Sequence, residues 1–233
     1  MRVAARVVAT LFAAALLFAS PARAERTRVG EAPEAVEAGD CELELGWERR
    51  LASGQPTEYE RTGELACGIG WRTEIALAFS RRGVEGVNDH ALGLEVKTAI
   101  RDRPLGGVGL KLLYGIGGER PGGGRWRQVD HFAALEAAWQ PSLAWLLQAR
   151  LGTAHDREAR VNSTLWALGV EWLIAPALEG KLELDGDDRG RSFVTIGLKW
   201  PLWPDRALLS VGYGVGIGAA RERRVGIGLT IEF

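Results

Sequence analysis

The chain has 233 residues, a length that suits one domain of ordinary size, and its 29 Lys and Arg nearly balance its 30 Asp and Glu, for a net charge of −1. The lack of a basic excess argues against nucleic-acid binding. With 46% hydrophobic and 25% charged residues, the chain is neither disordered nor a bundle of membrane helices. The 31 glycines and 9 tryptophans favour strands with aromatic anchors.

The first 24 residues have the pattern of a secretory signal peptide. Arg2 and Arg6 precede an apolar stretch at 7–19, and a small-X-small cleavage site ends at Ala24. The alternative, an uncleaved anchor, is disfavoured because the apolar run is too short to span roughly 30 Å of hydrocarbon. The sequence therefore predicts an exported chain that begins near Glu25.

Residues 25–40 are polar and lack periodicity, so we interpret them as a periplasmic lead-in to a domain at 41–233. From residue 41 onward, apolar residues alternate with small or polar ones. Strands place successive side chains on opposite faces, so this period predicts strands with one apolar face. Twelve such segments lie at 42–48, 57–68, 74–79, 92–100, 108–115, 135–139, 143–151, 166–172, 181–184, 194–200, 209–218 and 225–233.

The connectors between these segments alternate between short turns and generally longer polar loops, as expected of strands that cross a membrane with periplasmic turns on one side. An even strand number lets the last strand pair with the first, and closure is needed because open edges are not satisfied in hydrocarbon. We predict an all-β, closed antiparallel transmembrane barrel of about twelve strands, with 10 to 14 allowed.

A soluble β-protein would show the same period with its apolar face inward. Three features favour lipid on the apolar side: the other face is largely Gly, Ala, Ser and Thr; the last strand ends in an aromatic residue; and tryptophans fall beside the short turns. Indoles at such positions form an interfacial girdle. The girdle residues we predict are Trp139, Trp172, Trp200 and Phe233.

On this register, charged residues line the lumen. They either pair across strands and fill the interior, or form a net negative channel that favours cations and neutral solutes. The predicted lumen-facing charges are Glu44, Glu64, Glu95, Lys97, Lys111, Glu136, Arg150, Glu171 and Lys199.

The two cysteines, Cys41 and Cys67, are symmetric about Gly54, which lies in the natural turn between the first two strands. Residues with a constant index sum face each other in an antiparallel hairpin, with Cβ atoms about 4.5–5.5 Å apart. An exported chain meets an oxidising compartment. We therefore predict a Cys41–Cys67 disulfide near the periplasmic end, with two free buried thiols as the alternative.

No catalytic, metal or cofactor site is predicted, because three histidines and two cysteines offer few ligands and no lipase-like signature occurs. The residues from which a site can be imagined are His155 with Ser163, or Asn162-Ser163 alone, although the Asn-Ser pair equally fits an ordinary strand start.

The predicted outer loops are rich in arginine, which pairs with the phosphates of lipopolysaccharide, although ordinary solvated loops are an equal alternative. These residues are Arg81, Arg82, Arg120, Arg125, Arg157, Arg160, Arg189, Arg221, Arg223 and Arg224.

The segments Asp40-Cys41-Glu42-Leu43-Glu44, Thr57-Glu58-Tyr59, Ala66-Cys67-Gly68 and Trp203-Pro204-Asp205-Arg206 occur in this order. With them the chain resembles, loosely over residues 28 to 233, a family of small bacterial outer-membrane proteins named for the MetA pathway of phenol degradation and often labelled transporters. The resemblance implies an outer-membrane barrel that passes aromatic or other small organic solutes. A C-terminal strand ending at Phe233 resembles the signal read by the barrel-assembly machinery.

We therefore expect a narrow outer-membrane channel. The alternatives are a structural or surface-interaction barrel with a filled lumen and, last, a lipid-modifying enzyme in the barrel wall.

Overall fold

The computed structural model describes residues 36–52, 54–103, 105–157, 160–190, 192–203, 206–217 and 222–233. The predicted signal peptide at 1–24 and the lead-in up to residue 35 lie outside the described residues. Among the residues described, no helix is long and apolar enough to cross a membrane.

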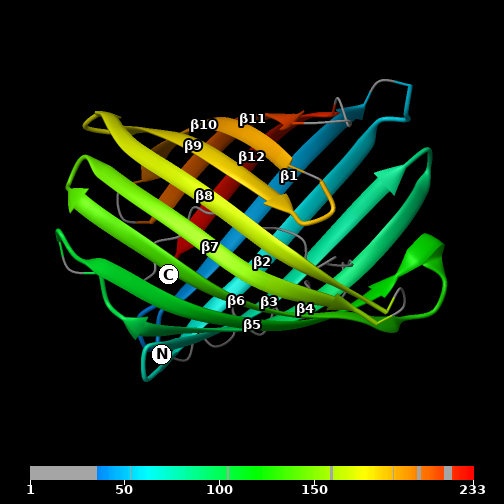
Figure 1. Ribbon diagram of the computed structural model, residues 1–233, viewed down its shortest axis with the longest axis horizontal. Coiled ribbons are helices and arrows are strands. Elements are labelled where there is room, and N and C mark those ends of the chain that lie inside the picture. Colours follow the sequence, from blue (N-terminus) through cyan, green and yellow to red (C-terminus); the bar gives the residue numbers. More distant parts are fainter. Residues whose placement is uncertain are drawn as a thin grey trace.

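Twelve antiparallel strands form one closed barrel, as the alternation predicted (Figure 1). Each strand pairs with its neighbours in sequence, and β12 pairs with β1. The described part of the chain adds a single short 3-10 helix, η1 (Pro121–Gly123). The strands are β1 (Cys41–Ala52), β2 (Glu58–Gly70), β3 (Thr73–Val84), β4 (Val87–Arg101), β5 (Val108–Arg120), β6 (Arg127–Ser142), β7 (Trp145–Asp156), β8 (Val161–Ala175), β9 (Leu178–Asp187), β10 (Ser192–Trp203), β11 (Ala207–Ile217) and β12 (Glu222–Glu232).

The seam between β1 and β12 closes the barrel. Its register runs from Glu42 opposite Glu232 to Ala52 opposite Glu222. Beyond that register, Cys41 and Phe233 exchange two backbone hydrogen bonds of 2.9 Å each. The start of β1 and the end of β12 therefore lie at the same end of the barrel, which we call the terminal end; the opposite end is the far end.

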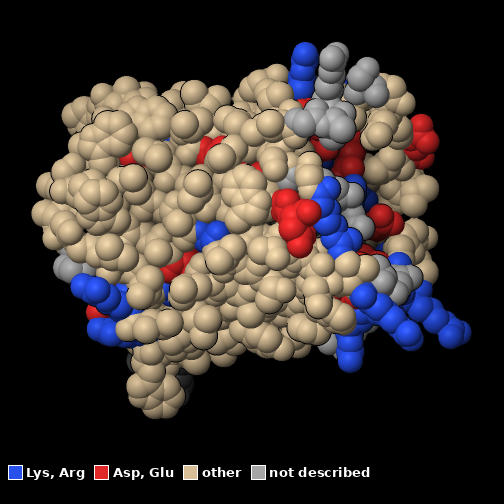
Figure 2. All heavy atoms as spheres, viewed as in Figure 1, with Lys and Arg blue, Asp and Glu red and all other residues tan. Residues whose placement is uncertain are grey.

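The period of two separates an outward apolar face from an inward polar one. On β5, Leu112 and Ile116 are 48% and 40% exposed, whereas Lys111 between neighbouring apolar positions is 1% exposed. The other strands repeat this inversion, and alanines such as Ala76 and Ala167 account for much of the apolar material that is buried. Figure 2 shows the result: uncharged atoms cover most of the wall, and charged side chains gather toward its ends.

This distribution is the reverse of a water-soluble protein, whose large apolar side chains would be buried. A row of exposed Leu, Ile and Val around a closed sheet is stable where the surroundings are hydrocarbon. The outward orientation of the apolar rows therefore follows from the exposure of the side chains.

The connectors differ in part from the predicted division into short and long sets. The connector between the predicted strands at 74–79 and 92–100 is a tight hairpin whose turn is Glu85-Gly86, both with positive φ (49° and 85°). At the terminal end the link between β4 and β5 spans 102–107 and is longer than a two-residue turn. The length of a polar stretch did not predict the length of the loop, because polar residues also occupy the inward positions at the ends of the strands.

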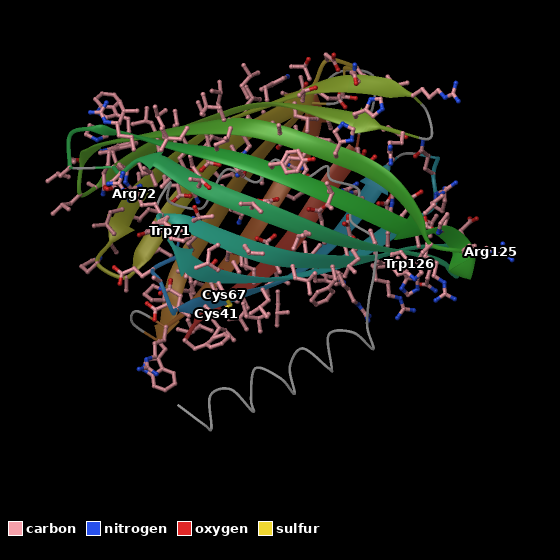
Figure 3. The ribbon with its side chains drawn as sticks, turned by 90° about the horizontal axis from the view of Figure 1, so that it is seen from below. Cys41, Cys67, Trp71, Arg72, Arg125 and Trp126 are labelled. Carbon is pink, nitrogen blue, oxygen red and sulfur yellow. A yellow bond between two sulfur atoms is a disulfide. The ribbon has the colours of Figure 1, made fainter. Side chains whose placement is uncertain are left out.

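The predicted disulfide between Cys41 and Cys67 is present, with the two Cα atoms 4.1 Å apart (Figure 3). The two residues face each other in the β1–β2 register, as their index sum requires. Both share the parity of outward residues such as Leu45, so the disulfide lies on the outer face at the terminal end.

We expect Leu94→Arg, at the middle of β4, to lower the free energy of unfolding by about 2–4 kcal/mol, because it brings a charge to the hydrocarbon-facing side. Leu94 is 45% exposed and pairs with Leu77 and Ile116. Denaturant unfolding in lipid vesicles measures the loss, with Leu94→Phe as the apolar control. An arginine variant as stable as the phenylalanine variant would show that this face meets water.

Replacing both cysteines by serine should lower the free energy of unfolding by about 3 kcal/mol, because the disulfide restricts the unfolded chain across a separation of 26 residues. Denaturant unfolding with and without a reducing agent measures this loss. The reductant should destabilise the natural protein and leave the double variant unchanged; equal stability of all four samples would contradict the prediction.

Candidate functional site

The lumen holds the candidate site, because the inward face of every strand delivers its polar side chains there. Among the described residues, no group of three or more His, Cys, Asp or Glu is arranged to hold a metal ion. The charged side chains instead form separate groups of ion pairs around the inner wall.

The first group, the Lys97 cluster, lies on β2, β3 and β4. The Lys97 Nζ atom is 2.8 Å from Glu64, 3.2 Å from Glu74 and 3.7 Å from Glu95. Lys97 and Glu74 are directly opposite in the register, and both are buried. One ammonium group thus neutralises part of the charge of three carboxylates.

The end of the predicted lead-in meets this cluster. The Val36 N–H donates a hydrogen bond of 2.8 Å to the Glu74 carboxylate. A Cβ on Gly68, which is buried, would lie 2.3 Å from the Val36 carbonyl oxygen and 2.1 Å from that of Glu37. Residues 36 and 37 therefore pack against the inner face of β2, and only glycine fits at position 68.

A second group joins β6 and β7. Glu136, 1% exposed, accepts hydrogen bonds from Arg150 Nε at 2.8 Å and from its terminal nitrogen at 2.5 Å. Lys111 on β5 is the direct register partner of Glu136 and is equally buried. Large charged side chains thus occupy the interior beside β5, β6 and β7.

A third group lies on β8, β9 and β10. Lys199 donates a buried hydrogen bond of 2.6 Å to Glu171, although β9 lies between their strands. On β9 itself, Lys181 is 2.7 Å from Glu183. The Lys199–Glu171 contact crosses the inner surface of β9, whereas the Lys181–Glu183 contact follows that strand.

Arg224 on β12 makes the longest crossing. It pairs with Asp185 on β9, donates hydrogen bonds of 3.1 and 2.6 Å to the Thr195 hydroxyl, and lies over the Phe193 ring. Its path crosses Gly214, where a Cβ would come within 2.6 Å of the arginine side chain. Glycine at 214 is therefore what lets the guanidinium lie flat against β10 and β11.

The last group surrounds Arg50 near the far end of β1. Its guanidinium is 2.7 Å from Glu48, 3.5 Å from Glu58 and 3.4 Å from Glu60. Arg82 on β3 also pairs with Glu58. Glu222 on β12 is 3.9 Å from Arg50 Nε, so two arginines share four carboxylates here.

Beside these groups lies a cavity of about 140 Å³ between β9 and β1, which we call the β9–β1 cavity. Gly197, Gly212 and Gly226 are consecutive register partners on β10, β11 and β12, and they form a glycine row in its wall. Lys181 and Glu48 are the register partners at the two ends of this row.

The glycine row keeps the cavity open. A Cβ on Gly212 or Gly226 would meet its nearest atom only at 3.5 Å, an ordinary contact, so the backbone leaves free space above it. The charged lining combines four cations, Arg50, Lys181, Lys199 and Arg224, with three carboxylates, Glu48, Glu183 and Asp185. The expected net negative lumen is thus absent around this cavity, where the two signs nearly balance.

The predicted lumen charges are spread around the wall rather than gathered into one site. Glu64, Glu95 and Lys97 meet in one cluster, while Lys111, Glu136 and Arg150 lie together on the next strands. Glu171 pairs with Lys199, and Glu44 faces Glu64 in the β1–β2 register.

The sequence reasoning missed Arg50, Asp185 and Arg224 as interior residues and placed Arg82 and Arg224 in outer loops. All of these side chains make interior ion pairs. Extending the period of two beyond the apolar stretch of each strand would have placed them on the inward face.

The predicted girdle residues lie toward the terminal end of their strands. Trp139, Trp200 and Phe233 are exposed, and Trp139 donates a 3.3 Å hydrogen bond to the Gly106 carbonyl. Trp172 stacks on Trp145 with ring centroids 6.3 Å apart. Trp71, at the tip of the β2–β3 turn, is 92% exposed (Figure 3).

His155 and Ser163 are not brought together as an enzymatic pair. His155 faces Asn162, with His155 Nδ1 2.7 Å from the Asn162 amide oxygen, and its ring lies beside the tilted His131 ring with the centroids 4.9 Å apart. Ser163 is the next residue along β8 and points to the opposite face of the sheet.

Comparison with known proteins adds a family and a fold. The model of the family described as uncharacterised conserved protein UCP029691 matches residues 12–233. A search of curated proteins found no match.

Solved structures with a similar fold include the COG4313 outer membrane channel from Pseudomonas putida F1, with a TM-score of 0.64 and 10% identity over 89% of this chain and 100% of that one. The KdgM porin in complex with disordered oligogalacturonate has a TM-score of 0.58 and 9% identity over 82% of this chain and 99% of that one. The NanC porin has a TM-score of 0.55 and 14% identity over 81% and 98%. Likeness at such identities concerns the barrel fold alone.

Replacing Lys97 by glutamine should lower the free energy of unfolding by about 3 kcal/mol, because it leaves three carboxylates in the interior without their shared cation. The matched variant Lys97→Arg keeps the charge and should lose much less. Denaturant unfolding of both variants in vesicles measures the difference in the free energy of unfolding. Equal losses in the two variants would show that the shape of the side chain at position 97, rather than its charge, determines stability there.

Proposed function

The chain belongs to the family described as uncharacterised conserved protein UCP029691, and we propose that it is an outer-membrane channel for small polar organic solutes. The observation that carries this proposal is the β9–β1 cavity, a polar space inside a barrel whose exposed wall is apolar. The family description names no pathway, so the phenol-degradation label suggested by the short motifs stays a hypothesis.

The location in the outer membrane is supported by the closed twelve-strand barrel and its exposed apolar side chains. The predicted signal peptide supports export, and an even strand number returns the chain to the side from which it starts. We therefore assign the terminal end to the periplasm and the far end to the cell exterior. The exposed aromatic ring of Phe233, directly after β12, is the feature that supports recognition by the barrel-assembly machinery.

The class of solute follows from the lining of the cavity. Four cations and three carboxylates surround the glycine row, so neither anions nor cations gain a large net attraction. A neutral or zwitterionic solute with hydrogen-bonding groups matches this lining best. An aromatic solute fits the proposal when it carries such polar groups, because the lining has few apolar side chains.

The second candidate is a structural or surface-interaction barrel whose lumen is filled. Its support is the packing beside β2 to β7, where the Lys97 cluster, the Glu136–Arg150 pair and residues 36 and 37 occupy interior space. Closely paired charges and the β9–β1 cavity occur in the same barrel, so conductance decides between the two functions.

Purified protein in planar bilayers should give small conductance steps, and Gly212→Leu should reduce them by roughly half. The leucine side chain would project from the glycine row into the 140 Å³ cavity, since a Cβ at 212 has its nearest neighbour at 3.5 Å. Gly212→Ala is the matched control and should conduct nearly as the natural protein does.

Silent bilayers with correctly folded natural protein would favour the structural barrel. Equal conductance of the alanine and leucine variants would show that ions take another path. Uptake of radiolabelled polar solutes in a deletion strain, with and without Gly212→Leu, then tests the solute class directly.

A further inference from the structure

Five exposed arginines lie on the outer face of the barrel near the far end, and we call them the outward arginine face. Each lies within three residues of the far end of its strand. Their positions have the parity of the exposed apolar residues, not that of the lumen. They are Arg223 on β12, Arg49 on β1, Arg61 on β2, Arg81 on β3 and Arg120 on β5.

The register places Arg61 and Arg81 side by side, and Arg120 lies two strands from Arg81 in the same row. Arg61 is directly opposite Arg81, Arg81 is opposite His90, and His90 is opposite Arg120. Neighbouring strands lie about 4.8 Å apart, and like charges directly opposite on one face destabilise a sheet. Such a row is favourable when an anion from outside lies across it.

Among the described residues, the strand positions on this face supply no such anion. The outward positions of β12 and of β1 to β5 include no Asp or Glu. Arg49 lies over the Tyr59 ring, Arg81 donates to the Asn88 side chain, and Arg120 donates to backbone carbonyls. Within the described residues, none of the five arginines pairs with a carboxylate, whereas Arg50, Arg82, Arg150 and Arg224 in the lumen all do.

The residues next to the arginines on the same face indicate what kind of molecule covers them. Toward the middle of the barrel the face continues with apolar residues, among them Leu77 and Leu94. A partner of this face is therefore apolar along most of its length and anionic at one end. Guanidinium groups bind phosphate with two parallel hydrogen bonds, which suits a phosphorylated lipid headgroup.

We propose that the outward arginine face binds the phosphate groups of lipopolysaccharide in the outer leaflet, with its acyl chains against the apolar rows below. The assignment rests on the far end facing the cell exterior and does not depend on channel activity. It differs from the arginine set expected from sequence, because Arg82 and Arg224 turn into the lumen while Arg49 and Arg61, within strands, turn outward.

The test uses the full-length processed protein in detergent and deep-rough lipopolysaccharide as the probe, with binding measured by native mass spectrometry. The double variant Arg61→Gln/Arg81→Gln should bind about tenfold more weakly, because it loses two charge-assisted contacts. Arg101→Gln/Arg206→Gln removes the same charge from exposed arginines at the terminal end and should bind as the natural protein does.

Two further arms identify the ligand. Enzymatically dephosphorylated lipopolysaccharide should bind the natural protein as weakly as the native lipid binds the Arg61/Arg81 variant, and millimolar inorganic phosphate should compete poorly. A second pair, Arg49→Gln/Arg120→Gln, covers the case in which the first does not fold. Equal binding of the phosphorylated and dephosphorylated lipids, unchanged binding by both far-end variants, or an equal loss in the terminal-end control would overturn the proposal.

Discussion

The structure depends on the pairing of every strand edge. In hydrocarbon an unpaired backbone N–H or C=O has no water to bind, so a membrane sheet must close on itself. The β1–β12 register and the two hydrogen bonds between Cys41 and Phe233 provide this closure. Once the sheet is closed, the alternation of side chains allows only two faces, and the apolar face takes the lipid side.

That orientation places about half of the strand side chains on the inward face, where charged groups such as Lys97 and Glu136 are buried and need partners. The side chains that fill the inward positions differ from one part of the wall to another. Beside β2 to β7, carboxylates and cations pair closely, as in the Lys97 cluster and the Glu136–Arg150 pair. Beside β9 to β12, glycines replace side chains and leave the β9–β1 cavity. Ion pairs such as Lys181–Glu183 and Arg224–Asp185 also surround that cavity, so the glycines rather than a lack of charged side chains account for the space.

Arginine illustrates how one residue type serves two environments in this chain. Inside, Arg224 crosses two strands to reach Asp185, and its charge is satisfied by the protein. Outside, Arg61 and Arg81 stand side by side without a carboxylate on their face. The inward arginines pair with carboxylates of the protein, whereas the outward arginines are those that we propose bind a phosphorylated lipid.

The amino-acid sequence by itself determined the period of two, the twelve strands and the pairing of Cys41 with Cys67, because alternation and hairpin register are local properties of neighbouring residues. Residues such as Lys97 and Glu136 were also recognised as lumen candidates from parity alone. Only the tertiary structure decided that Arg224 turns inward to Asp185 and that Gly197, Gly212 and Gly226 line up beside a cavity. The Arg224–Asp185 pair joins strands that are not neighbours, and the glycine row depends on the registers of three strands. The curvature of the closed sheet brings these residues together, and no local sequence pattern encodes that curvature.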